Sequence, residues 1–256
     1  MNGTVRSRAI AEDAPRPFGA SFLSCRQVDV PLRYRHEINN NLMNPRTMQT
    51  KTNLLSCYNA EGLIEAGCDE AGRGCLAGSV FAAAVILPDG YASNQLDDSK
   101  RLTARQRYAL REVIMRDAVA WAVGEVTAKE IDEMNILNAS IEAMHRALSV
   151  LAVQPRFIIV DGNRFKPYGD IPYQTIVKGD SKYQSIAAAS ILAKTFRDDA
   201  MRSLGNQYPA YGWERNFGYP TAAHREAIRR CGPSPFHRLT FNLIGNGKTP
   251  PKRRNV

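Results

Sequence analysis

The alternation of hydrophobic and polar residues divides the chain into three segments. Residues 1–53 scatter arginine, proline and asparagine among isolated apolar residues, without a sustained period of 2 or 3.6. Residues 54–245 carry regular apolar patterns, and residues 246–256 form a short basic tail. We therefore expect one folded domain over residues 54–245. The extension before it is either disordered or lies upstream of a translation start at Met43 or Met48.

Five short apolar runs in the central segment predict β-strands. They cover residues 63–70, 79–88, 121–128, 157–162 and 173–180. The second run is almost continuously apolar, and the third alternates between apolar and polar positions. Segments rich in Gly, Asp, Asn and Ser follow several of these runs, which is typical of loops.

Apolar residues that recur every three or four positions predict helices between the strands. Thr103 begins one helix, the segment around Asn138 opens a second, and residues 185–204 form a third that is rich in alanine. A fourth helix precedes Gly232, a favourable C-cap, and residues 233–244 form a terminal amphipathic piece. Strands interspersed with helices predict an α/β fold with a five-stranded mixed sheet flanked by helices.

Composition narrows the possible classes of protein. The chain has 34 Lys and Arg against 25 Asp and Glu, a formal net charge of +9, which favours a polyanionic partner without separating DNA, RNA and anionic membrane. No apolar run approaches the 18 residues that a membrane span needs, and no secretory signal begins the chain. The five cysteines are odd in number and lack CxxC spacing, so we expect a reduced, cytoplasmic protein without a zinc site.

Four acidic residues stand where the predicted strands and helices meet. They are Asp69, Glu70, Asp161 and Asp180. An isolated Asp at such a position is usually a turn or cap residue. The carboxyl ends of strands in an α/β sheet, however, lie along one crevice, and oxygen ligands suit Mg²⁺ or Mn²⁺. The four carboxylates therefore predict a metal site for phosphodiester chemistry.

Three of these acids raise a question of role or geometry. Asp180 precedes the third helix, where the helix dipole favours an ionised carboxylate, so an N-cap and a metal ligand are equally good interpretations. Asp69 and Glu70 are adjacent, and adjacent residues of a regular strand point to opposite faces. Both reach one site only if the strand bends, unless Glu70 contributes its backbone carbonyl.

The segment AGRGCLAG, residues 71–78, carries a second signal. Gly72 and Gly74 flank Arg73, which permits close approach of the backbone to a ligand. Neither a Walker motif nor the complete GxGxxG spacing is present, so the turn alone is a weak indication.

Taken together, the motifs closely resemble those of the bacterial ribonuclease HII family, the type 2 ribonucleases H. The resemblance extends in order over residues 62–245. Its motifs are GCDEAGRGCLAG, LDDSKRLT, FIIVDG, KGDSKYQSIAAASILAKTFRD, YGWERNFGYPTAAH and PSPFHR. It implies a ribonuclease H-like fold with a helical C-terminal region. It also implies a monomeric endoribonuclease that cuts the RNA strand of RNA–DNA hybrids, nicks 5′ of single ribonucleotides in duplex DNA and leaves 5′-phosphate products.

The resemblance also assigns roles to residues. The four carboxylates would bind two Mn²⁺ or Mg²⁺ ions that activate water, with Asp69 bridging them and Asp180 completing the site. The backbone of Gly72, Arg73 and Gly74 would recognise the ribose 2′-hydroxyl. Additional contacts are implied for Tyr219, which would pack on a sugar, and for Lys100 and Lys182, which would contact phosphates.

The chain departs from the family pattern at three positions. Cys75 stands where proline is usual, Cys68 where a β-branched or similar apolar residue is usual, and Pro220 where glycine is usual. None removes a catalytic group, but Pro220 bears on how Tyr219 is presented to the substrate.

Other acidic and aromatic residues are expected to be structural. Residues 97–98 are interpreted as a turn, and Asp198 and Asp199 as part of a solvated ion-pair face. Trp213 is expected in the core, and His224 is either structural or part of the substrate groove.

Two alternatives remain at this stage. One is a non-catalytic nucleic-acid-binding protein that kept the fold, although all four acids are present. The other is a different metal-dependent nuclease on the same fold. The AGRG turn and Tyr219 favour the ribonuclease, because both concern the 2′-hydroxyl.

Overall fold

The computed structural model describes residues 54–96 and 99–245. Four segments with stated expectations lie outside these ranges: the N-terminal extension, the two candidate start methionines within it, the acidic pair at residues 97–98 and the basic tail. Within the described ranges no helix is long and apolar enough to cross a membrane.

A single five-stranded mixed sheet organises the domain. Its strands are β1 (Glu65–Ala71), β2 (Val80–Ile86), β3 (Ala120–Val126), β4 (Phe157–Asp161) and β5 (Tyr173–Ile176). They lie in the order β3-β2-β1-β4-β5, antiparallel between β1, β2 and β3 and parallel between β1, β4 and β5. The predicted five-stranded mixed sheet is confirmed, although β5 ends at Ile176 rather than at residue 180.

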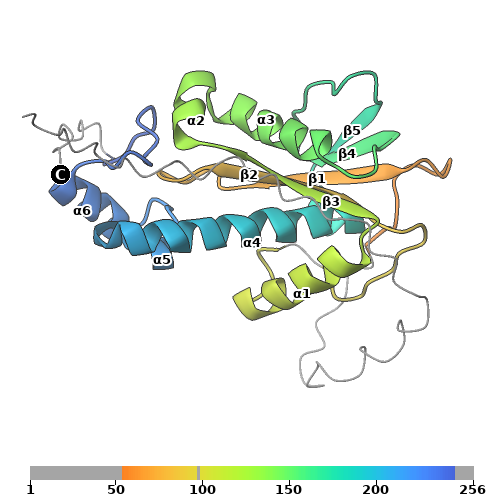
Figure 1. Cartoon of the computed structure of the whole chain (residues 1–256), viewed down its shortest axis with the longest axis horizontal. Helices are drawn as coiled ribbons and strands as arrows, with labels where there is room; N and C mark the ends of the chain where they lie inside the picture. Colours follow the sequence, from red (N-terminus) through yellow and green to blue (C-terminus); the bar gives the residue numbers. More distant parts are fainter. Residues whose placement is uncertain (1–53, 97–98, 246–256) are drawn as a thin grey trace, which may run out of the picture.

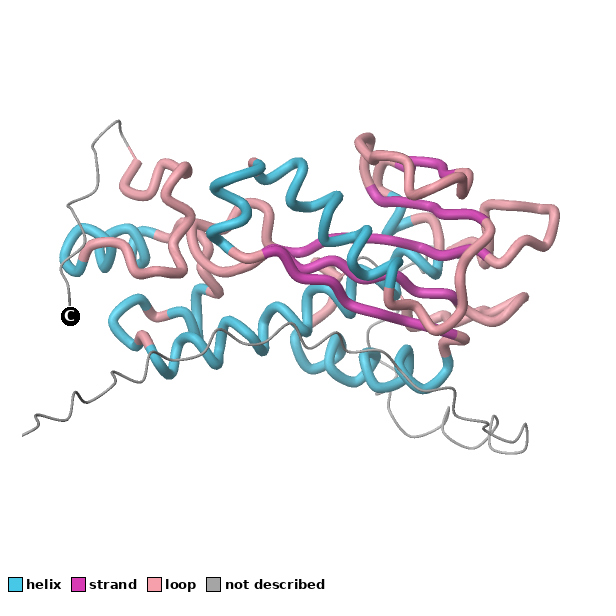
Figure 2. Tube along the Cα trace, turned by 45° about the horizontal axis from the view of Figure 1, so that its top comes forward, coloured by secondary structure: helices cyan, strands magenta, loops and turns pink. Residues whose placement is uncertain are grey.

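Helices cover both faces of the sheet (Figure 1). The α-helices are α1 (Ala104–Asp117), α2 (Ala128–Met134), α3 (Ile136–Ser149), α4 (Gln184–Gln207), α5 (Trp213–Asn216) and α6 (Ala222–Cys231). Two short 3₁₀ helices, η3 (Gly179–Ser181) and η4 (Pro209–Tyr211), connect them. Helices α2 and α3 lie on one side of the sheet and α1 and α4 on the other, with α5 and α6 at the far end of α4 (Figures 1 and 2).

Local capping explains where several helices begin. Thr103 and Gln106 form a capping box at the start of α1, which confirms the predicted start. A second capping box, from Thr127 and Glu130, starts α2, a helix that the sequence analysis did not separate from α3. Asn135 separates the two helices. Its φ is 67°, and its side chain accepts hydrogen bonds from the amides of Leu137 and Asn138 in the first turn of α3.

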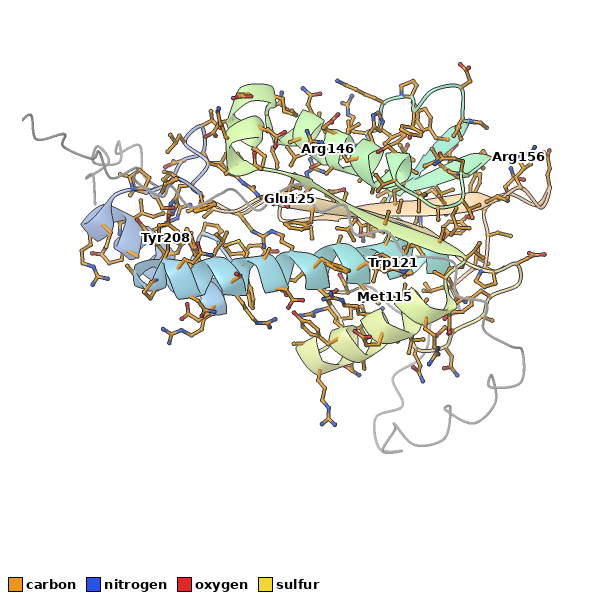
Figure 3. All side chains as sticks on the ribbon, viewed as in Figure 1. Met115, Trp121, Glu125, Arg146, Arg156 and Tyr208 are labelled. Carbon is orange, nitrogen blue, oxygen red and sulfur yellow. The ribbon has the colours of Figure 1, made fainter. Side chains whose placement is uncertain are left out.

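Side-chain alternation along β1 defines two cores. Ala66 and Cys68 pack with α3, whereas Gly67 faces α4. A Cβ at Gly67 would overlap the backbone of Ser185, so α4 lies directly on the centre of the sheet. The outer layers are tied to β3: Trp121 donates its indole N–H to the Met115 carbonyl (3.2 Å), and Arg146 donates to the Glu125 carbonyl (2.7 Å) (Figure 3).

A third core joins Leu76 and Ala77, which follow β1, to the C-terminal region. Trp213 is fully buried there with Leu76, Ile228 and Leu243, so its predicted core position is confirmed. Gly232 caps α6 as expected. Residues 233–245, which include the amphipathic piece expected at residues 233–244, form turns and an isolated bridge between Ala77 and His237.

Candidate active site

Asp69 and Asp161 occupy adjacent positions on two paired strands. The last registered pair between β1 and β4 is Cys68 with Val160, and both of these side chains belong to the core on the α3 side. Because side chains alternate along a strand, Asp69 and Asp161 both face the α4 side, next to each other. Asp69 is buried, and burial together with the charges of Glu70 and Asp161 raises the pKa of its carboxyl well above the ordinary value.

Glu70 reaches the same acidic group without a break in the strand. Strand β1 stays paired with β2 through Ala71, so its ladder continues past the point where a bend was one of the two ways for both acids to serve one site. The Glu70 amide donates to Asp69 Oδ1 (2.7 Å), and its carboxylate accepts from Arg73 (3.2 Å). Burial raises the pKa of Glu70, opposed by the charge of Arg73 and reinforced by that of Asp161. The charge of Asp161 therefore raises the pKa of both Asp69 and Glu70, which are adjacent on β1.

Asp180 arrives by a different route from the one that the apolar pattern predicted. It does not end a strand: β5 ends four residues earlier, and Asp180 lies in η3 between β5 and α4. Asp161 Oδ1 accepts the amide of Gly179 (2.7 Å), which fixes η3 against the end of β4. Asp161 and Asp180 line one open pocket together with Lys100 and Lys178.

The donor set fits a hard divalent cation, although the carboxylates are turned to nearby donors in this structure. In the described part of the chain, no three His, Cys, Asp or Glu side chains are close enough to hold a metal ion as they stand. Oxygen ligands dominate the group, and the main charges acting on buried Asp69 are other carboxylates. A bound cation would relieve that repulsion and favour the ionised acids. The four-carboxylate metal set remains a prediction.

The Gly72–Gly74 turn follows the acids directly, and its two glycines differ. Gly72 is buried with φ +101°, and a Cβ there would overlap Nε of Arg197. Gly74 is exposed, and a Cβ there would meet no heavy atom within 4 Å. Packing within the protein therefore requires glycine at residue 72, whereas residue 74 presents bare backbone to open space.

Tyr219 lies beside this turn. The Gly218 carbonyl accepts the amide of Leu76 (2.8 Å), and the Tyr219 hydroxyl interacts with the buried thiol of Cys75. The Tyr219 side chain is 38% exposed, with the Lys194 ammonium 5.6 Å from its ring centroid. Cys75 is accommodated in place of the usual proline, and a partly exposed aromatic ring stands next to the turn.

The two predicted phosphate-contacting lysines occupy different surroundings. Lys100 approaches Asp180 (3.4 Å from Nζ to Oδ2) at the rim of the pocket. Lys182 is exposed and follows η3. The structure thus places both near the acids, and neither assignment is tested by it.

Three polar residues around the site were missed by sequence reasoning: Ser190, Arg197 and Arg238. Ser190 hydrogen-bonds to Asp69 and to Ser99 (2.8 Å), from the face of α4 that covers the sheet. Arg197 follows Ser190 by seven residues, two helical turns further along this face. For Ser190 and Arg197, the available signal was a polar residue within the apolar spacing of an Ala-rich helix.

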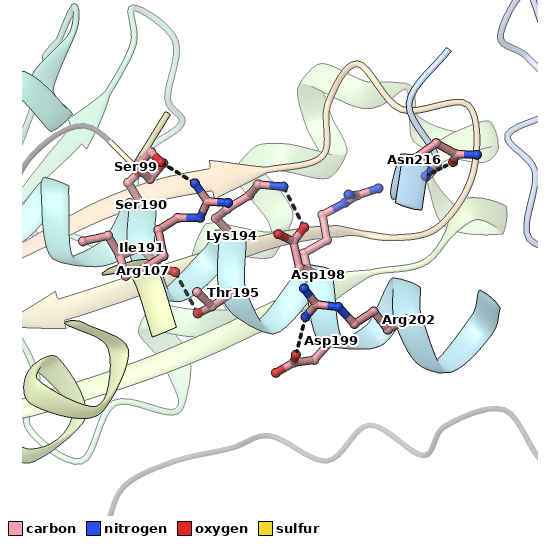
Figure 4. Close-up of polar contacts among 12 residues, drawn as sticks. Ser99, Arg107, Ser190, Ile191, Lys194, Thr195, Asp198, Asp199, Arg202 and Asn216 are labelled. Atoms are coloured by element: carbon pink, nitrogen blue, oxygen red, sulfur yellow. Dashed lines mark hydrogen bonds and ion pairs between the residues drawn. The ribbon is translucent and has the colours of Figure 1, made fainter. Parts of the chain in front are cut away.

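Other expectations need correction. Asp198 is buried and pairs with Lys194 (2.6 Å), whereas Asp199 forms the exposed ion pairs that were expected of both (Figure 4). His224 is fully buried, so its structural interpretation holds and it does not line the groove. Its Nδ1 lies 2.9 Å from the carbonyl of Tyr219.

Comparison with known proteins identifies the class. The family model described as Ribonuclease HII matches residues 66–244. The chain is 63% identical over 192 residues to a curated ribonuclease HII of Phocaeicola vulgatus, covering 75% of this chain and 96% of that protein. A Bacteroides fragilis ribonuclease HII is 64% identical over 188 residues, covering 73% and 94%. Among solved structures, the ribonuclease H2 of Pyrococcus horikoshii superposes with a TM-score of 0.60 at 28% identity, covering 70% of this chain and 94% of that chain.

The mixed sheet, its flanking helices and the acids at the ends of β1 and β4 define a nuclease with the ribonuclease H-like fold. Within that class, the sequence match extends over almost the whole described domain. The chain belongs to the ribonuclease HII family and is an endoribonuclease of the ribonuclease H type, an activity directed at RNA–DNA hybrids.

Proposed function

We propose that this enzyme also nicks on the 5′ side of single ribonucleotides embedded in duplex DNA, in a reaction that depends on Mn²⁺ or Mg²⁺. The observation that supports the proposal is the joining of three features in one place: the buried Asp69 of β1 beside the half-buried Asp161 of β4, a glycine turn with its exposed residue at Gly74, and Tyr219 against that turn. Acids alone would suit any metal-dependent nuclease. The turn and the tyrosine add a surface on which a ribose can be distinguished from a deoxyribose.

Asp69, Glu70, Asp161 and Asp180 would hold two divalent ions, which when bound supply charge neutralisation at the scissile phosphate and an activated water. Asp69 and Asp161 contribute from neighbouring strands, and Asp180 contributes from η3, which the Gly179 amide ties to Asp161. Ser190 orients the Asp69 carboxylate from α4. Hydrolysis would leave a 5′-phosphate on the downstream fragment.

The remaining assigned residues bind the substrate. The Gly74 amide and its neighbours would donate to the 2′-hydroxyl, because the backbone there is open to a ligand. Tyr219 would pack against the adjacent sugar, and Lys100 and Lys182 would contact phosphates. The net charge of +9 supplies sequence-independent affinity for the duplex. We further propose that the enzyme acts as a cytoplasmic monomer.

The decisive assay uses a DNA duplex that contains one ribonucleotide, incubated with Mn²⁺ or Mg²⁺. We expect a nick 5′ of that ribonucleotide and no cut in the all-DNA duplex. Asp69→Asn should lower the rate at least about 100-fold, as loss of a group acting in the transition state does, with duplex affinity retained. Glu133→Gln, an exposed acid on α2, serves as the matched control.

Each alternative gives its own result. Binding of the duplex without any nick would identify a non-catalytic protein, and cutting of the all-DNA duplex would identify a different metal nuclease. Full activity in the Asp69→Asn variant would refute the role assigned to that residue.

A further inference from the structure

Two buried arginines bind carbonyls of the loop between β1 and β2, which contains the Gly72–Gly74 turn. Arg197 of α4 donates from Nε to the Ser79 carbonyl (3.2 Å) and from its NH2 group to that of Ala77 (3.3 Å). Arg238 donates from Nε to the Gly78 carbonyl (3.0 Å) and from its NH1 group to that of Arg73 (3.0 Å). Both guanidinium groups are fully buried.

The bond from Arg238 to the Arg73 carbonyl has a directional consequence. That carbonyl belongs to the same peptide group as the amide of Gly74, and the described chain contains no cis peptide bond. In a trans peptide the C=O and N–H point in opposite directions. Because Arg238 binds the C=O from the protein interior, the Gly74 N–H points away from Arg238, and residue 74 itself is exposed. A hydrogen bond from a charged donor to the carbonyl also polarises the peptide and strengthens its N–H as a donor.

The backbone around Arg238 is itself anchored. Its amide donates to the Leu76 carbonyl (2.9 Å), and the amide of Gly78 donates to the Phe236 carbonyl (2.9 Å). The next two residues along the chain, 239 and 240, donate their amides to the carboxylate of Asp132 on α2 (2.7 and 2.9 Å). Arg238 thus reaches the turn from a fixed segment.

Burying two cations side by side is unfavourable for stability. Burial lowers the pKa of Arg238 to about 10. Of the neighbouring groups, Cys75 acts to raise this pKa and Arg197 acts to lower it. One N–H group on each arginine, NH1 of Arg197 and NH2 of Arg238, lacks a hydrogen-bond partner among the described residues. Well-packed apolar side chains often serve a core at least as well as buried charges do. The arrangement therefore points to a role in fixing backbone direction.

We propose that Arg238 is a positioning residue for substrate specificity: it orients the Gly74 amide toward the ribose 2′-hydroxyl. Arg197 packs against Gly72 in the same turn. This inference rests on the proposed recognition of ribonucleotides by the Gly72–Gly74 turn. Arg238 touches neither the substrate nor the metal-binding acids, and it acts through the peptide between residues 73 and 74.

The test compares Arg238→Lys with Arg225→Lys in the full chain. Arg225 also donates to two backbone carbonyls of the C-terminal region, those of Asn242 and Leu243, but to none in the turn. Lysine keeps the charge and lacks the planar fork that reaches two carbonyls at once. For each variant we would measure kcat and KM on the single-ribonucleotide duplex, Kd for the all-DNA duplex of the same sequence, and the shift in Tm that Mn²⁺ produces.

We expect Arg238→Lys to lower kcat/KM on the ribonucleotide duplex at least about 30-fold, with Kd for the all-DNA duplex and the Mn²⁺-induced Tm shift changed less than about 3-fold. Arg225→Lys should change each quantity less than about 3-fold. Asp132→Asn, a partly exposed change that loosens the segment after Arg238, should lower kcat/KM about 5-fold in the same selective way, and it answers the question if Arg238→Lys does not fold.

Two results would overturn the inference. Unchanged kcat/KM in Arg238→Lys and Asp132→Asn would remove the positioning role. An equal loss of DNA affinity and of the metal-induced shift would show that the residue only maintains the fold. If the unmodified enzyme fails to nick the ribonucleotide duplex, the proposed function itself is wrong, a result that is distinguishable from both.

Discussion

Gly72 and Gly74 are two residues apart and are glycine for different physical reasons. Positive φ and contact with Arg197 exclude a side chain at residue 72. Nothing in the protein excludes one at residue 74. In our proposal the substrate supplies the reason for glycine at residue 74.

This difference predicts opposite outcomes for two alanine substitutions. Gly74→Ala should change the free energy of unfolding by less than about 1 kcal/mol, because the methyl group enters open space. It should lower kcat/KM on the single-ribonucleotide duplex at least about 10-fold, because the methyl group blocks the approach of the ribose. Gly72→Ala should instead destabilise the fold by about 1–3 kcal/mol through backbone strain and overlap with Arg197.

Urea unfolding and steady-state kinetics on the two variants check the prediction. A Gly74→Ala enzyme with unimpaired activity would show that the substrate does not approach the backbone at this residue.

At the scale of elements, α4 connects most of the site. One face of this helix carries Ser190 against Asp69, Lys194 near Tyr219, and Arg197 against the turn. Their spacing of four and three residues keeps them on that face. A single rigid helix thereby sets the distance between the acids and the turn that would recognise the ribose.

Helix α6 is joined to the C-terminal segment by a pair of buried histidines. Trp213 donates its indole N–H to Nε2 of His224 (2.9 Å), and His224 Nδ1–H donates to the Tyr219 carbonyl (2.9 Å). Nδ1 of His237 accepts the amide of Ser234 (2.8 Å), so its Nε2–H is left to donate to His224 Nε2 (3.1 Å). This pattern requires both rings to be neutral.

The histidine pair predicts loss of stability in mild acid. Burial lowers the pKa of His224, with the charge of nearby Arg225 acting in the same direction against its backbone hydrogen bonds. In the unfolded chain the pKa of histidine is about 6.5, so His224 is protonated there below this pH. In the folded chain His224 stays neutral until the pH falls to its lowered pKa. The free energy of unfolding should therefore fall as the pH drops from about 6.5 toward the lowered folded pKa.

Urea unfolding between pH 8 and pH 5 measures this effect, with His224→Asn as the comparison. The variant should be less stable at pH 8, because it loses hydrogen bonds, and its stability should depend less on pH below 6.5. Parallel curves for the two proteins would show that His224 does not contribute.

For the whole molecule, the proposed metal site would couple cation binding to folding. Burial, followed by the charges of Glu70 and Asp161, raises the pKa of Asp69, and the acids come together only when β1, β4 and η3 are assembled. A cation that binds the folded chain alone stabilises it by RT ln(1 + [L]/Kd), about 2.7 kcal/mol at 100 times Kd. Saturating Mn²⁺ should therefore raise the Tm by several degrees.

The same ion should shift the Tm of Asp69→Asn much less, and that of the control Glu133→Gln as much as the unmodified protein. Thermal denaturation with Mn²⁺ and with a chelator provides the measurement. An equal shift in Asp69→Asn would place the stabilising ion elsewhere.

Much of the architecture could be predicted from local patterns. The five strands follow apolar runs, α1 begins after the expected Thr103, and α6 ends at the expected Gly232. The predicted end of β5 at residue 180 was wrong, because the apolar run continues past Ile176. The strand ends earlier, since Lys178 adopts a left-handed φ of 57°. The separation of α2 from α3 was missed, because Asn135 was not recognised as the residue that leaves the helical conformation and caps α3 with its side chain.

The sequence by itself determined the motifs, the strand and helix periods and the identity of the acids, because these depend on residue type and short-range spacing. Only the tertiary structure decided that Asp69 and Asp161 are neighbours, since strand register is set by long-range pairing. The roles of Arg197 and Arg238 also required it, because their carbonyl partners lie 118 to 165 residues away. No local pattern indicates which distant backbone group a buried guanidinium will bind.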